Sequence, residues 1–164
     1  MLHGPRPRFL DKWWHLNMYI YTYGDLFNES PERTVSHEEK IALTKKCERI
    51  LAAVMEEDDY GEYTWYIGQY NGFLAREYAA LGKEEETIRY FEKAVDGWLA
   101  YDTLPKEYTY RNILMTHRPY TAENIGHDFL SMKQYKAEVD RNADFDFVRE
   151  NERFRAAYRK MLVE

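Results

Sequence analysis

The sequence contains little cysteine and no long hydrophobic run, and both absences exclude classes of protein. Cys47 is the only cysteine, so the chain can form no internal disulfide and no zinc site built on several cysteines. Apolar residues surround Cys47 at helical spacing, and we expect it to be a small buried residue. No stretch approaches the ~18 consecutive apolar residues of a membrane-spanning helix, and the first residues lack the apolar stretch of a signal peptide. We therefore expect a cytoplasmic protein that does not enter a membrane.

Basic residues are also fewer than acidic residues in this sequence. The formal net charge is -6, whereas proteins that bind DNA or RNA rely on Lys and Arg to neutralise phosphates. We therefore expect no direct contact between this chain and nucleic acid. The 8 glycines are scattered along the sequence, which excludes a glycine-rich phosphate-binding loop.

Residue types that could carry catalysis do not form a familiar motif. The histidines show no pair at the i, i+4 spacing of a helical zinc site. Acidic runs at 56–59 and 84–86 fit a solvated turn and a first helical turn, where acids interact favourably with the helix dipole. We expect no enzyme, no metal and no cofactor. The alternative is a small hydrolase or metal enzyme, which a cluster of perturbed acids and histidines around one deep pocket would support.

Aromatic residues, in contrast, are abundant. The 164 residues include 15 Tyr, 8 Phe and 4 Trp, or 16% of the chain. Charged residues make up 32% and hydrophobic residues 45%, which is the composition of one soluble globular domain. Tyrosine combines an apolar ring with a polar tip, so it suits half-buried layers between helices and also binding surfaces.

Apolar residues recur at steps of three and four, which predicts an all-α fold. The predicted helices span about 9–23, 37–55, 62–81, 84–101 and 128–141, and a last one starts near residue 151. Ser36 and Glu39 have the spacing of a capping box, and Gly82 lies in a tight turn between two helices. Asn151 is a suitable N-cap for the last helix.

We predict a single domain with four parts. They are a leading linker at 1–8, two helix pairs at 9–101, an irregular connection at 102–126 and capping helices at 127–164. Pro105 and Pro119 punctuate the connection, which either holds a short helix around 110–115 or wraps the core.

The predicted core consists of the apolar stripe of each helix. Its members are Leu43, Cys47, Ile50, Leu51, Val54, Tyr66, Tyr70, Phe73, Leu74, Tyr78, Ile88, Phe91, Val95, Trp98, Phe129, Met132, Tyr135, Phe154, Tyr158 and Leu162.

Two segments of the chain superpose at an offset of 58 residues. They read Trp13-x2-Leu16-Asn17-x2-Ile20-x2-Tyr23-Gly24 and Leu74-Ala75-x2-Tyr78-x2-Leu81-Gly82, and the second continues through Thr87, Phe91 and Ala94. The pattern resembles the tetratricopeptide repeat (TPR), which has W-x2-L-G-x2-Y on its first helix and spaced A, F and A on its second. This resemblance implies antiparallel helix pairs stacked as an α–α superhelix.

The match to the repeat has departures and alternatives. Asn17 replaces a small residue, Ile20 a tyrosine and Thr87 an alanine. In a rival register, Trp14-x2-Asn17-x3-Tyr21, the tryptophan–tyrosine spacing is kept and the leucine is lost. Any packed antiparallel helix pair also shows Leu, Tyr and Ala at such steps, and this is the alternative to a true repeat.

A further resemblance covers most of the chain. The segments that carry it are 47–51, 80–83, 91–95, 101–105 and the closing stretch 145–154, which reads Phe-Asp-Phe-Val-Arg-Glu-Asn-Glu-Arg-Phe. Together they are similar to the C-terminal TPR-like region of bacterial helix-turn-helix regulators of the xenobiotic-response-element (XRE, Cro-type) class. The resemblance implies a regulatory or sensor domain of a transcription regulator, whose DNA reader lies outside this chain. A free-standing scaffold that joins proteins and has no connection to DNA is the alternative.

The repeat register predicts a binding groove for a peptide, a partner protein or a second copy of the chain. The first helix of each pair lines the concave face of a TPR array, which would place five side chains there: Trp14, Met18, Tyr21, Gln69 and Arg76. The aromatic rings would supply contact area and Arg76 would pair with a carboxylate. Alternatively, Trp14 and Met18 belong to the core.

Overall fold

The computed structural model describes residues 36–55, 59–105, 107–109, 120–121 and 131–162. The chain divides into two compact units, residues 1–36 and 37–164, and the described helices and strands all belong to the second. The helix predicted at 9–23 and the short helix considered around 110–115 lie outside the described residues.

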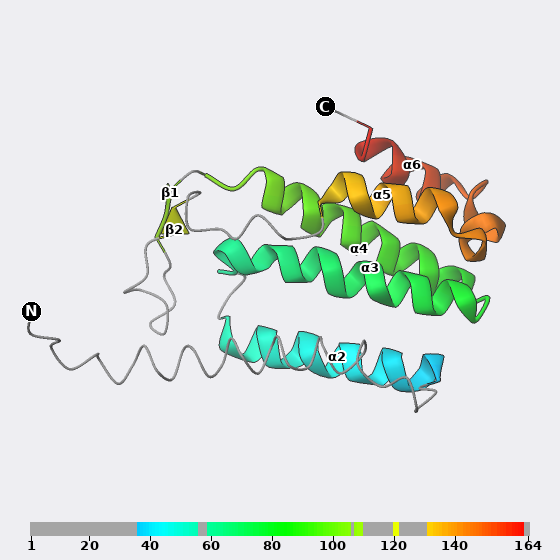
Figure 1. Cartoon of the computed structure of the whole chain (residues 1–164), viewed down its shortest axis with the longest axis horizontal. Coiled ribbons are helices and arrows are strands. Elements are labelled where there is room, and N and C mark those ends of the chain that lie inside the picture. Colours follow the sequence, from blue (N-terminus) through cyan, green and yellow to red (C-terminus); the bar gives the residue numbers. More distant parts are fainter. Residues whose placement is uncertain (1–35, 56–58, 106, 110–119, 122–130, 163–164) are drawn as a thin grey trace, which may run out of the picture. The chain divides into compact units, whose positions relative to one another are not determined.

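The described part of the second unit is mostly helical (Figure 1). Its elements are α2 (His37–Val54), the 3₁₀ helix η2 (Gly61–Tyr63), α3 (Thr64–Ala80), α4 (Glu84–Asp102), β1 (Glu107–Tyr108), β2 (Tyr120–Thr121), α5 (Met132–Arg141), the 3₁₀ helix η4 (Ala143–Val148) and α6 (Glu152–Lys160). The two short strands pair antiparallel, with Glu107 opposite Thr121. The predicted all-α class is thus confirmed for these residues, with one small strand pair added inside the connection.

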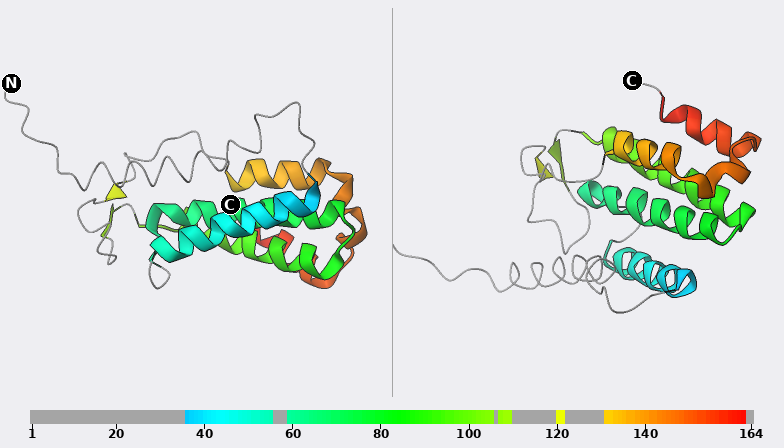
Figure 2. Two further views of the ribbon diagram at one scale, coloured as in Figure 1. Left: turned by 90° about the horizontal axis from the view of Figure 1, so that it is seen from below. Right: turned by 45° about the vertical axis from the view of Figure 1, so that its right-hand side comes forward.

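The helices of this unit form three layers. Helices α3 and α4 make the central antiparallel pair, and α2 packs against α3 on one side (Figure 1). On the other side lie α5, η4 and α6, with α6 against α4 (Figure 2). The elements predicted as C-terminal capping helices therefore cover one face of the central pair.

The turn between α3 and α4 explains why these two helices pack as a pair. Gly82 has a φ of 64°, a left-handed conformation that glycine adopts without steric cost. Its N–H donates to the Ala79 carbonyl at 2.9 Å, and the Lys83 N–H donates to the Tyr78 carbonyl at 3.0 Å. This is the Schellman pattern, which satisfies the last carbonyls of α3 and reverses the chain within three residues.

The backbones of α3 and α4 touch where two glycines face each other. A Cβ atom added to Gly97 would lie 2.6 Å from the Gly68 nitrogen, and one added to Gly68 would lie 2.8 Å from the Trp98 ring. Only glycine fits at such a distance, so this pair fixes the crossing point of the two helices. One turn along α3, a Cβ on Gly72 would lie 2.8 Å from the Tyr135 ring of α5.

Aromatic rings fill the space between the central pair and the C-terminal layer. Phe91 is 0% exposed, and its ring stacks on Phe154 with the ring centroids 4.2 Å apart. Phe145 of η4 and Tyr135 of α5 lie within 6.3 Å of the same ring, centroid to centroid. Aromatic side chains contribute large buried areas, so this cluster binds the layers together.

The starts of the C-terminal helices follow local capping signals. Ser131 and Gln134 form a capping box at the start of α5. The Asn151 side chain accepts a hydrogen bond from the Arg153 N–H, which confirms the predicted N-cap of α6. Between these helices, Arg149 donates from Nη2 to the carbonyl oxygens of Val139 and Asn142 at 3.0 and 3.2 Å.

Most of the predicted core is confirmed. The buried members are Cys47, Leu51, Tyr66, Tyr70, Leu74, Ile88, Phe91, Val95, Trp98, Tyr135 and Phe154. Leu43, Ile50, Phe73, Tyr78, Met132 and Tyr158 are half-buried. Phe129 and the Val54 side chain lie outside the described residues.

Two expectations on the C-terminal part are corrected, and one element of it was not predicted. Leu162 is 55% exposed and not a core residue: α6 ends at Lys160, and the buried residue that follows it is Met161. The described part of the fifth helix begins at Met132, because Ser131 caps it there. The 3₁₀ helix η4 was not predicted, although its buried residues Phe145 and Val148 belong to the closing stretch.

Candidate functional site

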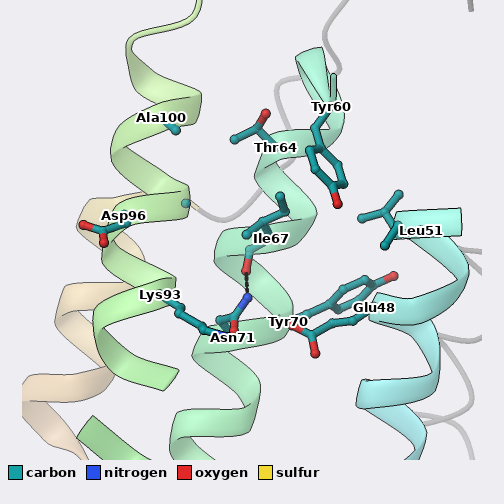
Figure 3. Close-up of a pocket in the computed structure, with 12 residues that line it drawn as sticks. Glu48, Leu51, Tyr60, Thr64, Ile67, Tyr70, Asn71, Lys93, Asp96 and Ala100 are labelled. Atoms are coloured by element: carbon teal, nitrogen blue, oxygen red, sulfur yellow. Dashed lines mark hydrogen bonds between the residues drawn. The ribbon is translucent and has the colours of Figure 1, made fainter. Parts of the chain in front are cut away.

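A groove of about 490 Å³ opens between α2, α3 and α4 (Figure 3). Each helix contributes residues at steps of three and four, which bring side chains to one face. The lining residues are Glu48, Leu51 and Ala52 of α2, Tyr60, Thr64, Ile67, Tyr70 and Asn71 from α3 and the segment before it, and Lys93, Asp96, Gly97 and Ala100 of α4.

Asn71 supplies the most unusual polar group of the groove. The residue is 3% exposed, and its Nδ2 donates to the Ile67 carbonyl at 2.8 Å. The side-chain oxygen Oδ1 has no hydrogen-bond partner within the described part of the chain. A buried acceptor without a partner costs about 1–3 kcal/mol, so a donor from a bound molecule would remove this cost.

Three charged side chains line the groove. Burial raises the pKa of the Glu48 carboxyl, while the Lys93 and Lys45 charges and the Asn71 amide act in the opposite direction. Asp96 pairs with Lys160 of α6, with Lys160 Nζ 2.7 Å from Oδ1. The Lys93 ammonium lies 5.5 Å from the centroid of the Tyr90 ring on its own helix.

Polar contacts join α2 to α3 at the end of the interface away from the groove. The Glu77 carboxylate of α3 is 3% exposed and faces the imidazole of His37 and the cationic side chains of Lys40 and Arg76. His37 Nδ1 lies 2.6 Å from Glu77 Oε2, Lys40 Nζ lies 3.9 Å from the same oxygen, and Arg76 Nη2 lies 3.3 Å from Oε1. Glu77 therefore fastens the first turns of α2 to α3.

A second contact between these helices uses tyrosine rings. Lys45 Nζ donates to the Tyr78 hydroxyl at 2.7 Å, and this hydrogen bond raises the pKa of the Lys45 ammonium. The Tyr78 ring stacks on Tyr90 of α4, with the centroids 5.3 Å apart and the planes 6° from parallel. The Lys45 ammonium lies above both rings, so cation–π attraction adds to the hydrogen bond.

The predicted groove residues fall in two classes. Trp14, Met18 and Tyr21 lie outside the described residues. Gln69 and Arg76 lie on α3, and at about 100° per residue they occupy the side turned away from Ile67 and Asn71. They therefore do not belong to the groove between α2 and α4.

Arg76 has protein partners of its own. Its side chain is 46% exposed, and its guanidinium lies 4.5 Å from the centroid of the Phe73 ring. With its contact to Glu77, this places the Arg76 cation at the edge of the α2–α3 junction. The prediction that this face binds a carboxylate stays a prediction.

The groove was missed because its residues do not follow the repeat register. Asn71 is the signal that could have revealed it, since asparagine is unfavourable inside a helix and here interrupts an otherwise apolar face.

Within the described residues, no group of three or more His, Cys, Asp or Glu side chains could hold a metal ion. No helix in the described part of the chain is long and apolar enough to cross a membrane. Cys47 is a free, buried thiol, and burial raises its pKa, which makes it a poor nucleophile.

Comparison with known proteins yields no match: no family profile, no curated protein and no solved structure is similar to the chain.

Proposed function

We propose that this chain is a TPR-like binding module that holds a segment of a partner protein in the groove between α2, α3 and α4. The observation that carries the proposal is a groove of about 490 Å³ with an unsatisfied, buried acceptor, Asn71 Oδ1, in its wall. Apolar side chains such as Leu51 and Ile67 surround this polar group. A few polar groups in a mostly apolar concavity are typical of binding sites.

Binding would act through α2. Its contacts with α3 include partly exposed ion pairs and hydrogen bonds beside buried apolar residues such as Cys47 and Leu51, whereas the backbones of α3 and α4 touch at paired glycines. A ligand seated between α2 and α4 would therefore move α2 against a fixed pair, and such a shift of packed helices can carry a signal to another domain.

We further propose that the module regulates a helix-turn-helix transcription regulator of the XRE class and is cytoplasmic and not an enzyme. This proposal is supported by the resemblance of the chain to such regulators. A coding sequence for a basic helix-turn-helix upstream of Met1 would support it. Without such a sequence, a free-standing scaffold that joins proteins becomes the better-supported function. The chain alone should not shift DNA at physiological salt, because its net charge is -6.

The face of α3 that carries Gln69 and Arg76 is a second candidate site, since the Arg76 cation is half exposed. Replacing Arg76 with Glu tests it: the charge reversal should abolish binding of an acidic partner if this face is the site. Unchanged binding would remove Arg76 from the site.

Peptide selection with the full chain tests the groove. A displayed random-peptide library should yield enriched sequences, and Ala52→Arg, which places a long side chain in the groove, should abolish their binding. Ala42→Arg is the matched control, because Ala42 is also exposed on α2 and lies about 15 Å nearer to the N-terminus of that helix. Equal binding by both variants would place the site elsewhere.

A further inference from the structure

The groove contains two acceptors that approach each other from different helices. Asn71 Oδ1 belongs to α3, and the Glu48 carboxylate extends from α2 towards it (Figure 3). The interaction of Glu48 with the Asn71 amide shows that the two groups are neighbours. The Asn71 amide and the Lys93 and Lys45 charges favour the ionised Glu48 carboxylate, whereas Asn71 Oδ1 has no donor within the described residues. The groove therefore lacks a donor that reaches both acceptors.

The charges around these acceptors leave Glu48 without an ion pair. Asp96, the other acid of the groove, pairs with Lys160 at 2.7 Å. The Lys93 ammonium is placed over the Tyr90 ring, and within the described residues it forms no ion pair with Glu48. Burial disfavours the Glu48 carboxylate, and the Lys93 and Lys45 charges offset this only in part, so an incoming cation at hydrogen-bond distance would stabilise it further.

Aromatic and small residues line the rest of the groove around Glu48 and Asn71. The rings of Tyr60 and Tyr70 line the groove on either side of Leu51, as Figure 3 shows. On the facing wall, Gly97 and Ala100 of α4 take up little room. A flat cationic group could therefore enter beside the tyrosine rings, which attract cations through their π faces.

We propose that the groove recognises an arginine-bearing peptide, whose guanidinium donates to both the Glu48 carboxylate and Asn71 Oδ1. This inference rests on the proposed function and names the chemistry of the segment that is bound. Arginine is favoured over lysine because its guanidinium presents five N–H donors in a planar fork and can satisfy two neighbouring acceptors at once. An apolar residue next to the arginine would pack against Leu51 and Ile67.

A random heptapeptide library displayed on phage and selected against the full chain supplies the test. The expected result is enrichment of arginine at one position, above lysine. Glu48→Gln should then lower the affinity of an enriched peptide roughly tenfold to hundredfold, which is the worth of hydrogen bonds to a charged group. Glu38→Gln is the matched control, since it removes the same charge from an exposed position on the same helix.

A charge exchange separates recognition from general damage to the fold. Glu48→Arg should lose the arginine peptide and gain affinity for the same peptide with its arginine replaced by glutamate. If Glu48→Arg loses the arginine peptide and gains no affinity for the glutamate peptide, the loss comes from damage to the fold and not from charge recognition, and that result would overturn the inference.

The outcomes also separate this inference from the proposed function. Enriched peptides that are acidic or wholly apolar, and that Ala52→Arg still rejects, would keep the groove as a binding site and overturn the arginine inference. Arginine peptides that bind Glu48→Gln as well as the parent chain would overturn it too. If no sequence is enriched, both proposals fail.

Discussion

The two interfaces of α3 are built in different ways. Towards α4, α3 presents Gly68, which meets Gly97 so closely that a single Cβ atom would overlap the backbone. Towards α2 it presents Glu77 and Tyr78, which form polar contacts with the partly exposed side chains of His37, Lys40 and Lys45. The first interface leaves no room between the two backbones. At the second, α2 buries apolar side chains such as Cys47 and Leu51 beside polar contacts that water can replace.

This difference shows where the molecule can respond to a partner. Close-packed interfaces tolerate little displacement, because any separation leaves a void. Polar contacts near the surface contribute less and re-form readily in a shifted position. The groove opens between α2 and α3 at the end opposite to these polar contacts, so binding and movement are expected on the same side of α3.

Removing the Phe91 ring should have the largest effect. Phe91→Ala would leave a cavity among the rings of Tyr135, Phe145 and Phe154 and should cost about 3–5 kcal/mol. Thermal unfolding followed by circular dichroism measures this loss. The same truncation at Phe147, which is 46% exposed, is the control and should change the melting temperature little. Equal melting temperatures for Phe91→Ala and the parent chain would contradict the described core.

A methyl group at Gly97 tests the close contact of α3 and α4. Glycine to alanine inside a helix normally stabilises by up to about 1 kcal/mol. Here the added Cβ would lie 2.6 Å from the Gly68 nitrogen, so we expect the opposite sign and a loss of about 1–3 kcal/mol. Chemical denaturation measures the change, and Arg89→Ala on the exposed face of α4 is the control. A stabilised Gly97→Ala variant would show that the backbones do not touch.

Neutralising Glu77 should weaken only the interface between α2 and α3. Glu77→Gln removes the charge that holds His37, Lys40 and Arg76, and we expect a cost of about 1–2 kcal/mol, because these partners are partly exposed. In hydrogen exchange, the amides of α2 should lose protection while those of α3 and α4 keep theirs. Glu138→Gln, on the exposed surface of α5, serves for comparison. Uniform loss of protection in all three helices would mean that the interfaces do not differ.

The smallest change in stability is expected for Glu48→Gln, and this change should be a gain, whereas the other substitutions cause a loss. The pKa of the Glu48 carboxyl is raised above the ordinary value of 4.5 by burial, so the folded chain binds this proton more tightly than the unfolded chain. Stability should therefore fall as the pH rises from about 4.5 through the raised pKa. Glu48→Gln should remove this decline and melt slightly higher at neutral pH, while Glu38→Gln should retain it. A lower melting temperature for Glu48→Gln at neutral pH would contradict the described burial.

The sequence allowed the helices to be predicted because their signals are local. Asn151 caps α6 as expected, Gly82 ends the tight turn, and apolar steps of three and four located Phe91 and Trp98 in the core. By contrast, the pairing of Gly68 with Gly97 depends on where two helices cross. That position is set by tertiary packing and leaves no pattern along the chain.

The candidate groove could not be predicted for a related reason. The repeat register assigns faces within one helix pair, and it directed attention to Gln69 and Arg76. The groove instead combines Glu48 of α2 with Asn71 of α3 and the small residues of α4, which come together only in the folded unit. Asn71 is the one residue whose sequence context hinted at a role.

The most direct test compares two side-chain amides on opposite faces of α3. Asn71 lines the groove and Gln69 lies on the other face, so their NH₂ signals report separately on the two candidate sites. The ¹⁵N-labelled full chain would be titrated with an arginine peptide enriched by the selection. We predict that the Asn71 signals shift in proportion to occupancy while those of Gln69 stay in place. Movement of the Gln69 signals with Asn71 unchanged would contradict the account and move the binding site to the face of Arg76.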